Sequence, residues 1–298
     1  MRLTLRAPAK LNLFLEVLGR RPDGYHEIRT VMHPISLYDR LTFRALPSGR
    51  VKLEGDTAEL GELNLVARAA RVLSKRVGRR LGAHVVIRKG IPTGGGLGGG
   101  SSDAAATLQA LARLHRLDLP PGGLEAAAAD VGSDVAFFVS ARTALCSGRG
   151  ERITPLQPAG KLDFVLVDPG VPLSTARVYQ ALKLALTHHP KDASQFVRTW
   201  SRGDLRRIGG SLFNRLERPA FKLAPSLKKL KKRLTHLRVL GTLMSGSGSC
   251  VYALVHGAAE ARETAARMRR TPSPEGWRVR TVRTADCDLD ARQAWTPE

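Results

Sequence analysis

The chain has 298 residues, of which 43% are hydrophobic and 25% are charged. This length allows roughly two packed domains, and this composition excludes an intrinsically disordered chain. Lys and Arg total 48 against 26 Asp and Glu, so the formal net charge of +22 indicates a negatively charged partner, such as a phosphorylated ligand, nucleic acid or anionic lipid.

Residues 2–18 alternate between polar and apolar side chains, which predicts an extended strand with one apolar face. Its opposite face carries the polar residues Arg6, Lys10, Asn12 and Glu16. Pro8 interrupts this run and predicts a sheet edge, a bulge or a break between two short strands. Residues 19–24 (GRRPDG) predict a tight turn, after which Tyr25 and His26 open the next strand.

Two regular elements are predicted before the middle of the chain. Asn64 is the expected N-cap of an amphipathic helix that extends to about Val77. The apolar side of this helix is expected to contain Leu65, Ala69, Val72 and Leu73. Residues 83–88 predict a strand.

The glycine-rich segment 91–103 (IPTGGGLGGGSSD) leads into an Ala- and Leu-rich helix, whose first turn would hold Ser101, Ser102 and Asp103. Glycines at six of the seven positions 94–100 leave the backbone amides free to converge on one anion, and the helix adds its positive end. The segment therefore predicts a phosphate site, with serine hydroxyls for phosphate or magnesium. A flexible turn is the plainer alternative.

Two better-known phosphate-binding motifs do not fit this segment. The pattern G-x-G-x-x-G occurs at Gly94, Gly96 and Gly99, but the repeated βαβ context of a dinucleotide fold is missing. A P-loop requires a lysine after the glycines, and none follows here.

The second half of the chain predicts an α+β layer. Helices are expected over residues 174–186, 221–234 and 258–269, with a basic region around 196–208 and a strand pair flanking 244–249. We expect a domain boundary near residue 160, which gives domains 1–160 and 161–298. The predicted core stripe of the second helix is Leu223, Leu227, Leu230 and Leu234. Its Lys and Arg residues are interpreted as a solvated face, with binding of polyanions as the alternative.

Cellular context follows from what the sequence lacks. No apolar run is long enough to span a bilayer and the N-terminus has no secretory apolar region, so we expect a cytoplasmic protein. Cys146, Cys250 and Cys287 are an odd set without close spacing, which argues against a disulfide framework or a zinc knuckle. We interpret them as reduced.

Three separated segments resemble the GHMP small-molecule kinases, a family named after galactokinase, homoserine kinase, mevalonate kinase and phosphomevalonate kinase. These segments are residues 7–13 (APAKLNL), 91–103 and 243–249 (LMSGSGS), and they extend over nearly the whole chain. The resemblance implies a two-domain α+β fold. Its parts would be an N-terminal ribosomal-protein-like β-α domain, a C-terminal ferredoxin-like α+β domain and a cleft between them.

Residues 8–27 are similar to the signature of one branch of this family. That branch uses ATP, with Mg²⁺, to phosphorylate the 2-hydroxyl of a CDP-linked methylerythritol in non-mevalonate isoprenoid precursor synthesis. Residues 132–138 and 170–175 resemble the same branch. Two positions depart from its pattern: Ala136 stands where proline is usual, and Arg215 stands where aspartate is usual.

The resemblance implies that Asp134 is the catalytic base and that Lys10 is the cation beside it. A nearby lysine would favour the ionised carboxylate and polarise the attacking oxygen. Taken alone, Asp134 is typical of a turn or a cap, and Lys10 is typical of a solvated strand residue. Only the combined motif favours catalysis.

The remaining site residues are also carried over from the resemblance. Tyr25 would stack on cytosine, with Tyr179 as a second ring, while His26 bonds the pyrimidine edge. Asn12 would hold the substrate, and Thr175 would lie near its sugar or phosphates. Asn64 would lie near the adenine nucleotide in addition to its role as a cap. The phosphate-binding loop would comprise Pro92, Gly94, Gly95, Gly96, Leu97, Gly98, Gly99, Gly100, Ser101 and Ser102. No residue is assigned as a direct metal ligand.

Two alternatives stay open from the sequence. One is another GHMP kinase that acts on homoserine, mevalonate or a sugar. The other is an RNA- or DNA-binding protein, which the charge allows. Aromatic residues make up only 5% of the chain and are not interleaved with the basic ones, as single-strand binding requires. We expect no specific nucleic acid, no membrane, and a monomer or homodimer.

Overall fold

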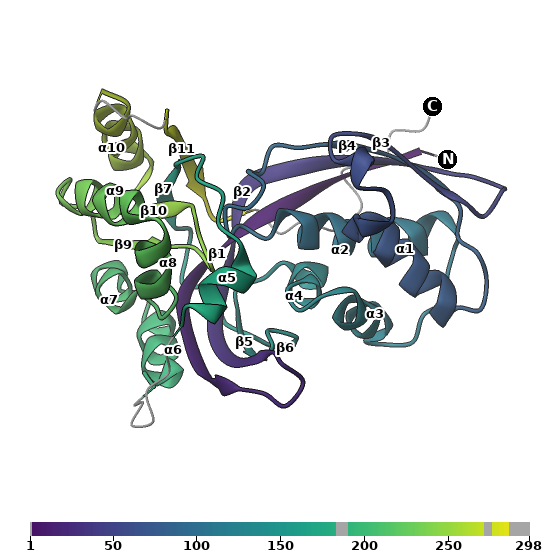
Figure 1. Cartoon of the computed structure of the whole chain (residues 1–298), viewed down its shortest axis with the longest axis horizontal. Helices are drawn as coiled ribbons and strands as arrows, with labels where there is room; N and C mark the ends of the chain where they lie inside the picture. The colour runs from purple at the N-terminus through teal and green to yellow at the C-terminus, as the bar shows by residue number, and fades with distance from the viewer. Residues whose placement is uncertain (1, 183–189, 271–275, 286–298) are drawn as a thin grey trace.

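The structure is a computed structural model that describes residues 2–182, 190–270 and 276–285. Two sheets lie side by side (Figure 1). The first sheet contains β1 (Arg2–Arg20), β2 (His26–Ala45), β3 (Val51–Gly55), β4 (Ala83–Arg88), β5 (Ala144–Gly148), β6 (Arg152–Pro155) and β8 (Phe213–Asn214). The second contains β7 (Asp163–Asp168), β9 (Gly241–Met244), β10 (Val251–Val255) and β11 (Arg278–Arg283). The predicted α+β class is confirmed.

The long antiparallel hairpin of β1 and β2 runs from the first sheet to the second (Figure 1). Its register shifts between Pro8 and Ala9, and β1 continues on both sides. Of the alternatives for Pro8, the bulge is therefore confirmed and the break is wrong, since a bulge tolerates a residue that cannot donate a ladder hydrogen bond. The predicted turn is confirmed, although Tyr25 belongs to it and β2 begins at His26.

Four helices cover one face of the first sheet: α1 (Leu65–Arg76), α2 (Gly99–Leu114), α3 (Gly123–Val131) and α4 (Val135–Ser140) (Figure 1). Asn64 caps α1 as predicted, because its side chain accepts a hydrogen bond from the N–H of Val66. The predicted apolar face is slightly rotated: Val66 and Ala70 are buried in addition to Ala69 and Leu73, whereas Leu65 and Val72 are only half-buried.

The second sheet is buried on both faces. Alternate residues of β7 point to opposite sides, so Phe164 and Leu166 pack against the β1–β2 hairpin with α6 (Ala193–Ser201) and α7 (Leu205–Ser211). Val165 and Val167 face the helices of the other side. Those helices are α8 (Glu217–Leu223), α9 (Pro225–Thr235) and α10 (Ala258–Arg270). This packing holds the C-terminal half against the strand that carries Lys10.

The single helix predicted over residues 221–234 is wrong, because α8 ends at Leu223 and α9 begins at Pro225. Proline disfavours helical backbone at the preceding residue, and Ala224 accordingly has φ −139° and ψ 85°. Leu223 is consequently 37% exposed and is no part of the core stripe, whereas Leu227, Leu230 and Leu234 are fully buried. The exposed positions of α9 include Lys228, Lys229, Lys232 and Arg233.

The remaining predictions for helices, strands, cysteines and membrane spans have the following outcomes. The described part of the helix expected over 174–186 is α5 (Thr175–Gln180), and residues 183–186 lie outside the described residues. The helix at 258–269 and the strand pair around 244–249 are confirmed as α10, β9 and β10. Cys146 and Cys250 are free and buried, and Cys287 lies outside the described residues. None of the helices in the described ranges has the length and apolar character to cross a membrane.

The domain boundary near residue 160 stays a prediction. The chain leaves the first sheet at the end of β6 and enters the second at the start of β7, on either side of that position. It later returns, since the two residues of β8 pair with Phe14 and Leu15 of β1.

Candidate functional site

Most of the candidate residues line one cleft with a volume of about 1110 Å³. This volume lies just above the usual range for sites that hold one small molecule, so the cleft has room for two phosphorylated ligands. The predicted residues that line it are Lys10, Asn12, Tyr25, His26, Asn64, Pro92, Gly94, Gly95, Gly96, Leu97, Gly98, Gly99, Gly100, Ser101, Asp134, Thr175 and Tyr179. Ser102 does not line the cleft, since it is 1% exposed behind the first turn of α2.

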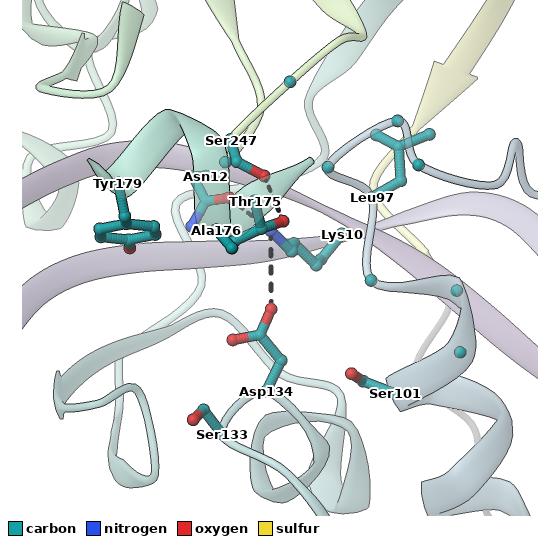
Figure 2. Close-up of a pocket in the computed structure, with 18 of the residues that line it drawn as sticks. Lys10, Asn12, Leu97, Ser101, Ser133, Asp134, Thr175, Ala176, Tyr179 and Ser247 are labelled. Carbon is teal, nitrogen blue, oxygen red and sulfur yellow. Dashed lines mark hydrogen bonds and ion pairs between the residues drawn. The ribbon is translucent and has the colours of Figure 1, made fainter. Parts of the chain in front are cut away.

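Lys10 is a buried cation in the middle of the cleft. Its Nζ donates to Oδ1 of Asn12 at 2.5 Å and lies 3.9 Å from Oδ2 of Asp134 (Figure 2). Burial lowers the pKa of Lys10, and the charge of Asp134 opposes this effect. The ammonium is thus held by one neutral amide and one distant carboxylate, which leaves it able to bind a further anion.

Asp134 contributes a partly exposed carboxylate to the cleft. It stands at the N-cap position of α4, yet its side chain makes no capping hydrogen bond and is 34% exposed. Figure 2 shows this carboxylate pointing at Lys10, with the Ser101 hydroxyl directed into the same space. Ala136 is the second residue of α4, where proline is tolerated but not required, so this departure from the family pattern leaves the helix start intact.

The glycine-rich loop lies against the turn between β9 and β10. A Cβ at Gly96 would lie 2.1 Å from the carbonyl oxygen of Ser245, and a Cβ at Gly98 would lie 2.8 Å from the ring of Phe138. Both residues have φ of +73°, which also favours glycine. The loop ends at α2, whose 16 residues direct a positive N-terminal end toward the cleft.

Exposed apolar side chains mark two parts of the cleft wall. Tyr25 is 53% exposed, Leu60 is 47% exposed and Leu63 is 85% exposed, and all three line the cleft. Large apolar groups left in water indicate a surface for a flat ligand group. Leu60 and Leu63 belong to the 3-10 helix Ala58–Leu63 before Asn64, whereas Tyr25 belongs to the β1–β2 turn.

His26 and Tyr179 meet beside Tyr25 although they lie far apart in the sequence. Their ring centroids are 4.8 Å apart. Burial lowers the pKa of His26 and nearby Arg20 lowers it further, so the ring is neutral at pH 7 and can both donate and accept a hydrogen bond. Burial also raises the pKa of Tyr179, with a contribution from Asp134. A planar heterocycle with polar edges fits this end of the cleft.

Besides Asn12, whose amide bonds Lys10 and Thr30, two predicted residues use their polar groups on the protein itself. Asn64 accepts from the N–H of Val66 with Oδ1 and donates to the carbonyl of Thr57 with Nδ2 at 3.0 Å, which is its capping role. The Thr175 hydroxyl lies 2.8 Å from the Ser247 hydroxyl. Figure 2 shows this hydroxyl pair on the side of Lys10 opposite Asp134. The pair joins α5 to the β9–β10 turn across the cleft.

The sequence reasoning missed a second lysine in the cleft. Lys89 Nζ contacts a carboxylate oxygen of Asp39 and donates to Oδ2 of Asp103 at 2.7 Å. The other oxygen of Asp39 accepts the N–H groups of Gly90 and Ile91, which fixes the start of the glycine-rich loop. Burial raises the pKa of Asp103 to about 7, and Lys89 opposes this effect. The only sequence signal was the position of Lys89 just before the loop.

Arg149 was also missed, because it lies in an unremarkable turn between β5 and β6. It lines the cleft, and its guanidinium carbon lies 4.9 Å from the centroid of the Tyr25 ring. A cation over an aromatic face is attractive, so Arg149 supports the exposed ring from one side.

Arg215, the second departure from the family pattern, has an acidic partner. Its Nε and Nη2 donate to the two carboxylate oxygens of Glu16, each at 2.7 Å, and Glu16 is fully buried. The paired geometry lowers the pKa of Glu16 against the effect of burial. The cation that replaces the usual aspartate is therefore neutralised by Glu16 of β1.

Comparisons with known proteins agree with this geometry. Residues 64–142 match the GHMP kinases N terminal domain, and residues 193–273 match the GHMP kinases C terminal domain. The chain is 45% identical over 273 residues to a 4-diphosphocytidyl-2-C-methyl-D-erythritol kinase of Pelotomaculum thermopropionicum, covering 91% of this chain and 95% of that protein.

Solved structures give the same result for the fold. A crystal structure of 4-(cytidine 5'-diphospho)-2C-methyl-D-erythritol kinase matches with a TM-score of 0.77 and 36% identity, over 94% of this chain and 99% of that chain. Homoserine kinase from Cytophaga hutchinsonii matches with a TM-score of 0.72 but 19% identity, over 95% of this chain and 94% of that chain. The second match supports the fold alone.

Proposed function

Because the chain belongs to the GHMP kinase family, and within it to the 4-diphosphocytidyl-2-C-methyl-D-erythritol kinases, we propose that it transfers the γ-phosphoryl group of ATP to the 2-hydroxyl of 4-diphosphocytidyl-2-C-methyl-D-erythritol. This reaction belongs to the non-mevalonate synthesis of isoprenoid precursors. The carrying observation is the Lys10–Asp134 pair, 3.9 Å apart, between a glycine-rich loop and a cluster of rings in one cleft.

Asp134 is the proposed base and Lys10 the proposed cation of this transfer. A partly exposed carboxylate that makes no capping hydrogen bond can accept the proton of the attacking hydroxyl, which is the main task of a base in phosphoryl transfer. The Lys10 ammonium can stabilise negative charge on the attacking and transferring oxygens. Asn12 fixes the direction of this ammonium, since its own amide is anchored to the Thr30 hydroxyl at 2.8 Å.

ATP would bind at the side of the cleft formed by the glycine-rich loop. The positive end of α2 and the amides of residues 94–100 suit the phosphates, while Leu60 and Leu63 offer an apolar surface for adenine. The Ser101 hydroxyl faces the cleft at the start of α2, and Mg²⁺ prefers oxygen ligands of this kind together with phosphate oxygens. When bound with ATP, Mg²⁺ would offset the phosphate charge.

The cytidine of the substrate would bind at the opposite side, among Tyr25, His26 and Tyr179. Tyr25 offers an exposed ring face, and a neutral His26 can bond both donors and acceptors on a pyrimidine edge. The Arg149 guanidinium beside Tyr25 adds positive charge on the path toward the diphosphate. The methylerythritol unit would then reach Lys10 and Asp134 in the centre.

We also propose the working context of the enzyme. The two predicted domains, 1–160 and 161–298, would form the two sides of the cleft, and ATP use points to the cytoplasm. A monomer or a homodimer stays our expectation for the oligomeric state.

The test is an assay of ADP release with purified protein, ATP, Mg²⁺ and the cytidylylated methylerythritol. We expect turnover that depends on this substrate and a new phosphomonoester by ³¹P NMR. The matched control is the analogue that lacks the 2-hydroxyl, which should give no ADP above background. Turnover with homoserine, mevalonate or a sugar, but not with the cytidylylated alcohol, would replace the proposal by another GHMP kinase activity.

A further inference from the structure

The turn between β9 and β10 covers the Lys10 ammonium. Gly246, Ser247 and Gly248 of this turn line the cleft. Gly246 has φ of +55°, and a Cβ added there would lie 3.2 Å from Nζ of Lys10 and 3.2 Å from Oδ1 of Asn12. The backbone of the turn is thus packed directly on the Lys10–Asn12 pair, so the position of the turn decides how much water reaches the ammonium.

One buried side chain outside the cleft holds this turn. Asn214 is 4% exposed, and its Nδ2 donates to the carbonyl oxygens of Met244 at 2.8 Å and Gly246 at 2.7 Å. Its Oδ1 accepts the N–H of Leu216 at 2.9 Å. Both donor hydrogens and the acceptor of the amide are therefore used within the protein, and Asn214 does not line the cleft. These bonds give it a task in shaping the turn.

Asn214 is itself fixed to the strand that carries Lys10. In β8 it pairs with Leu15 of β1, and the next residue, Arg215, bonds Glu16 of β1 through both carboxylate oxygens. Glu217 accepts the N–H of Met244 at 3.0 Å and so holds the start of the turn from the other side. Residues 214–217 therefore connect β1 to the turn that faces Lys10.

We propose that Asn214 is a positioning residue of the kinase site: its amide holds the turn over Lys10 and keeps the ammonium directed at Asp134. The inference rests on the role proposed above for Lys10. Asn214 touches no ligand in this assignment and acts only through the carbonyl groups of Met244 and Gly246. Loss of its two donated bonds should let the turn move away and admit water to Lys10.

The experiment compares Asn214→Asp with the parent. Aspartate keeps the size of the side chain but places a carboxylate oxygen against two carbonyl oxygens in place of two N–H donors. We expect kcat to fall about tenfold to a hundredfold, as for a misplaced catalytic group, with little change in the KM for ATP. Asn214→Ser retains one hydrogen-bond donor, so its kcat should lie between those of the parent and of Asn214→Asp.

A second readout does not depend on turnover. The rate of Lys10 acylation by a small amine-reactive reagent, followed by mass spectrometry over a range of pH, reports the pKa of the ammonium. In the parent, burial lowers this pKa, and the titratable groups that face Lys10 are Asp134 and Cys146. In Asn214→Ser, which adds no charge near the ammonium, the midpoint of this profile should move up toward that of an ordinary lysine, because water reaches the ammonium.

Two controls separate positioning from general destabilisation. Leu73→Ala and Leu230→Ala each remove a buried side chain, from α1 and α9 respectively, and among the described residues neither of them bonds the turn or residues 214–217. Both should keep the kcat and the acylation profile of the parent, measured below their unfolding temperatures. If the Asn214 variants lose stability but share these parental values, Asn214 is only structural and the inference is overturned. If Lys10→Met turns over like the parent, the proposed role of Lys10 fails, and the acylation profile still decides whether Asn214 holds the turn.

Discussion

Two lysine–aspartate sites lie in the same cleft and are built in opposite ways. Lys10 is 3.9 Å from a single carboxylate, that of Asp134, which is 34% exposed. Lys89 instead contacts two carboxylates, those of Asp39 and Asp103, whose side chains are 0% and 5% exposed. The Lys10 ammonium therefore has a weakly interacting counter-charge, whereas the Lys89 ammonium has two directly bonded carboxylates within the protein.

This difference in bonding distinguishes a catalytic site from a structural one. The Asp39 carboxylate is fully buried and bonds a lysine and two backbone amides, which uses three of its roughly four acceptor sites and leaves it out of reach of a substrate hydroxyl. Asp134 makes no capping hydrogen bond within the described residues, and its carboxylate is 34% exposed in the cleft. We infer that the Lys10 site serves phosphoryl transfer and that the Lys89 site holds the entrance of the glycine-rich loop. The predictions that follow test this division.

The largest expected effect is on turnover in Asp134→Asn. An amide cannot accept the hydroxyl proton, so kcat should fall about 10³-fold to 10⁴-fold while the fold stays intact. Steady-state ADP release measures kcat, and circular dichroism checks the fold. Asp130→Asn is the matched control, since Asp130 pairs with Arg76 on an exposed surface and its loss should leave kcat unchanged. Parental turnover in Asp134→Asn would contradict the assignment of the base.

Lys89→Met should act mainly on stability. It leaves the carboxylates of Asp39 and Asp103 buried together without their shared cation, and removal of one partner from a buried ion pair costs about 3–5 kcal/mol. Urea unfolding at pH 7.5 measures this free energy. Lys52→Met makes the same change at an exposed position of β3 and should cost little. Equal free energies of unfolding for the two variants would mean that the bonds of Lys89 to Asp39 and Asp103 do not stabilise the fold.

Lys10→Met should show the reverse pattern. Loss of the cation from the transfer site should lower kcat about 10²-fold to 10³-fold. The free energy of unfolding should stay the same or rise, because a buried ammonium with one distant carboxylate is replaced by an apolar chain of similar length. Kinetics and urea unfolding on one preparation measure both quantities. Stability loss like that of Lys89→Met would erase the distinction between the two sites.

Local features of the fold were predictable from the sequence. The Asn64 cap, the β4 strand and the start of α2 follow from residues within a few positions of one another. The break before Pro225 was missed even though its cause is local, because the leucine spacing continues across it and favoured one helix. The prediction thus gave more weight to the regular leucine spacing than to Pro225, which disfavours helical backbone at Ala224.

Long-range partners of the site were not predictable from the residues alone. Asp39 lies 50 positions from Lys89, and Glu16 lies 199 positions from Arg215, so no local pattern connects them. The polar residues of β1 gave a hint, because Lys10, Asn12 and Glu16 are all buried, although the register shift between Asn12 and Phe14 places Glu16 on the opposite face from the other two. Their spacing indicated a shared face but could not reveal whether water, a ligand or a distant side chain would satisfy them.

His33 sharpens the comparison with a third kind of buried titratable group, one whose two bonded partners are neutral. Its ring nitrogens bond the hydroxyls of Thr143 at 2.8 Å and Thr284 at 3.1 Å. Burial lowers the pKa of His33 from 6.5 to about 3. Below pH 6.5 His33 is therefore protonated in the unfolded chain but stays neutral in the folded protein. The free energy of unfolding consequently falls as the pH drops from 6.5 toward 3.

The expected loss from this one residue is about 2 kcal/mol between pH 7 and pH 5. His33→Gln keeps a donor and an acceptor for the two threonines but does not titrate. Urea unfolding of both proteins at the two pH values isolates the histidine, because the carboxylates titrate alike in each. The parent should lose about 2 kcal/mol more than the variant on acidification. Equal losses would show that His33 accepts a proton in the folded state. Two hydroxyl partners would then permit a buried group to change its charge, as we infer for Lys10 beside the distant carboxylate of Asp134.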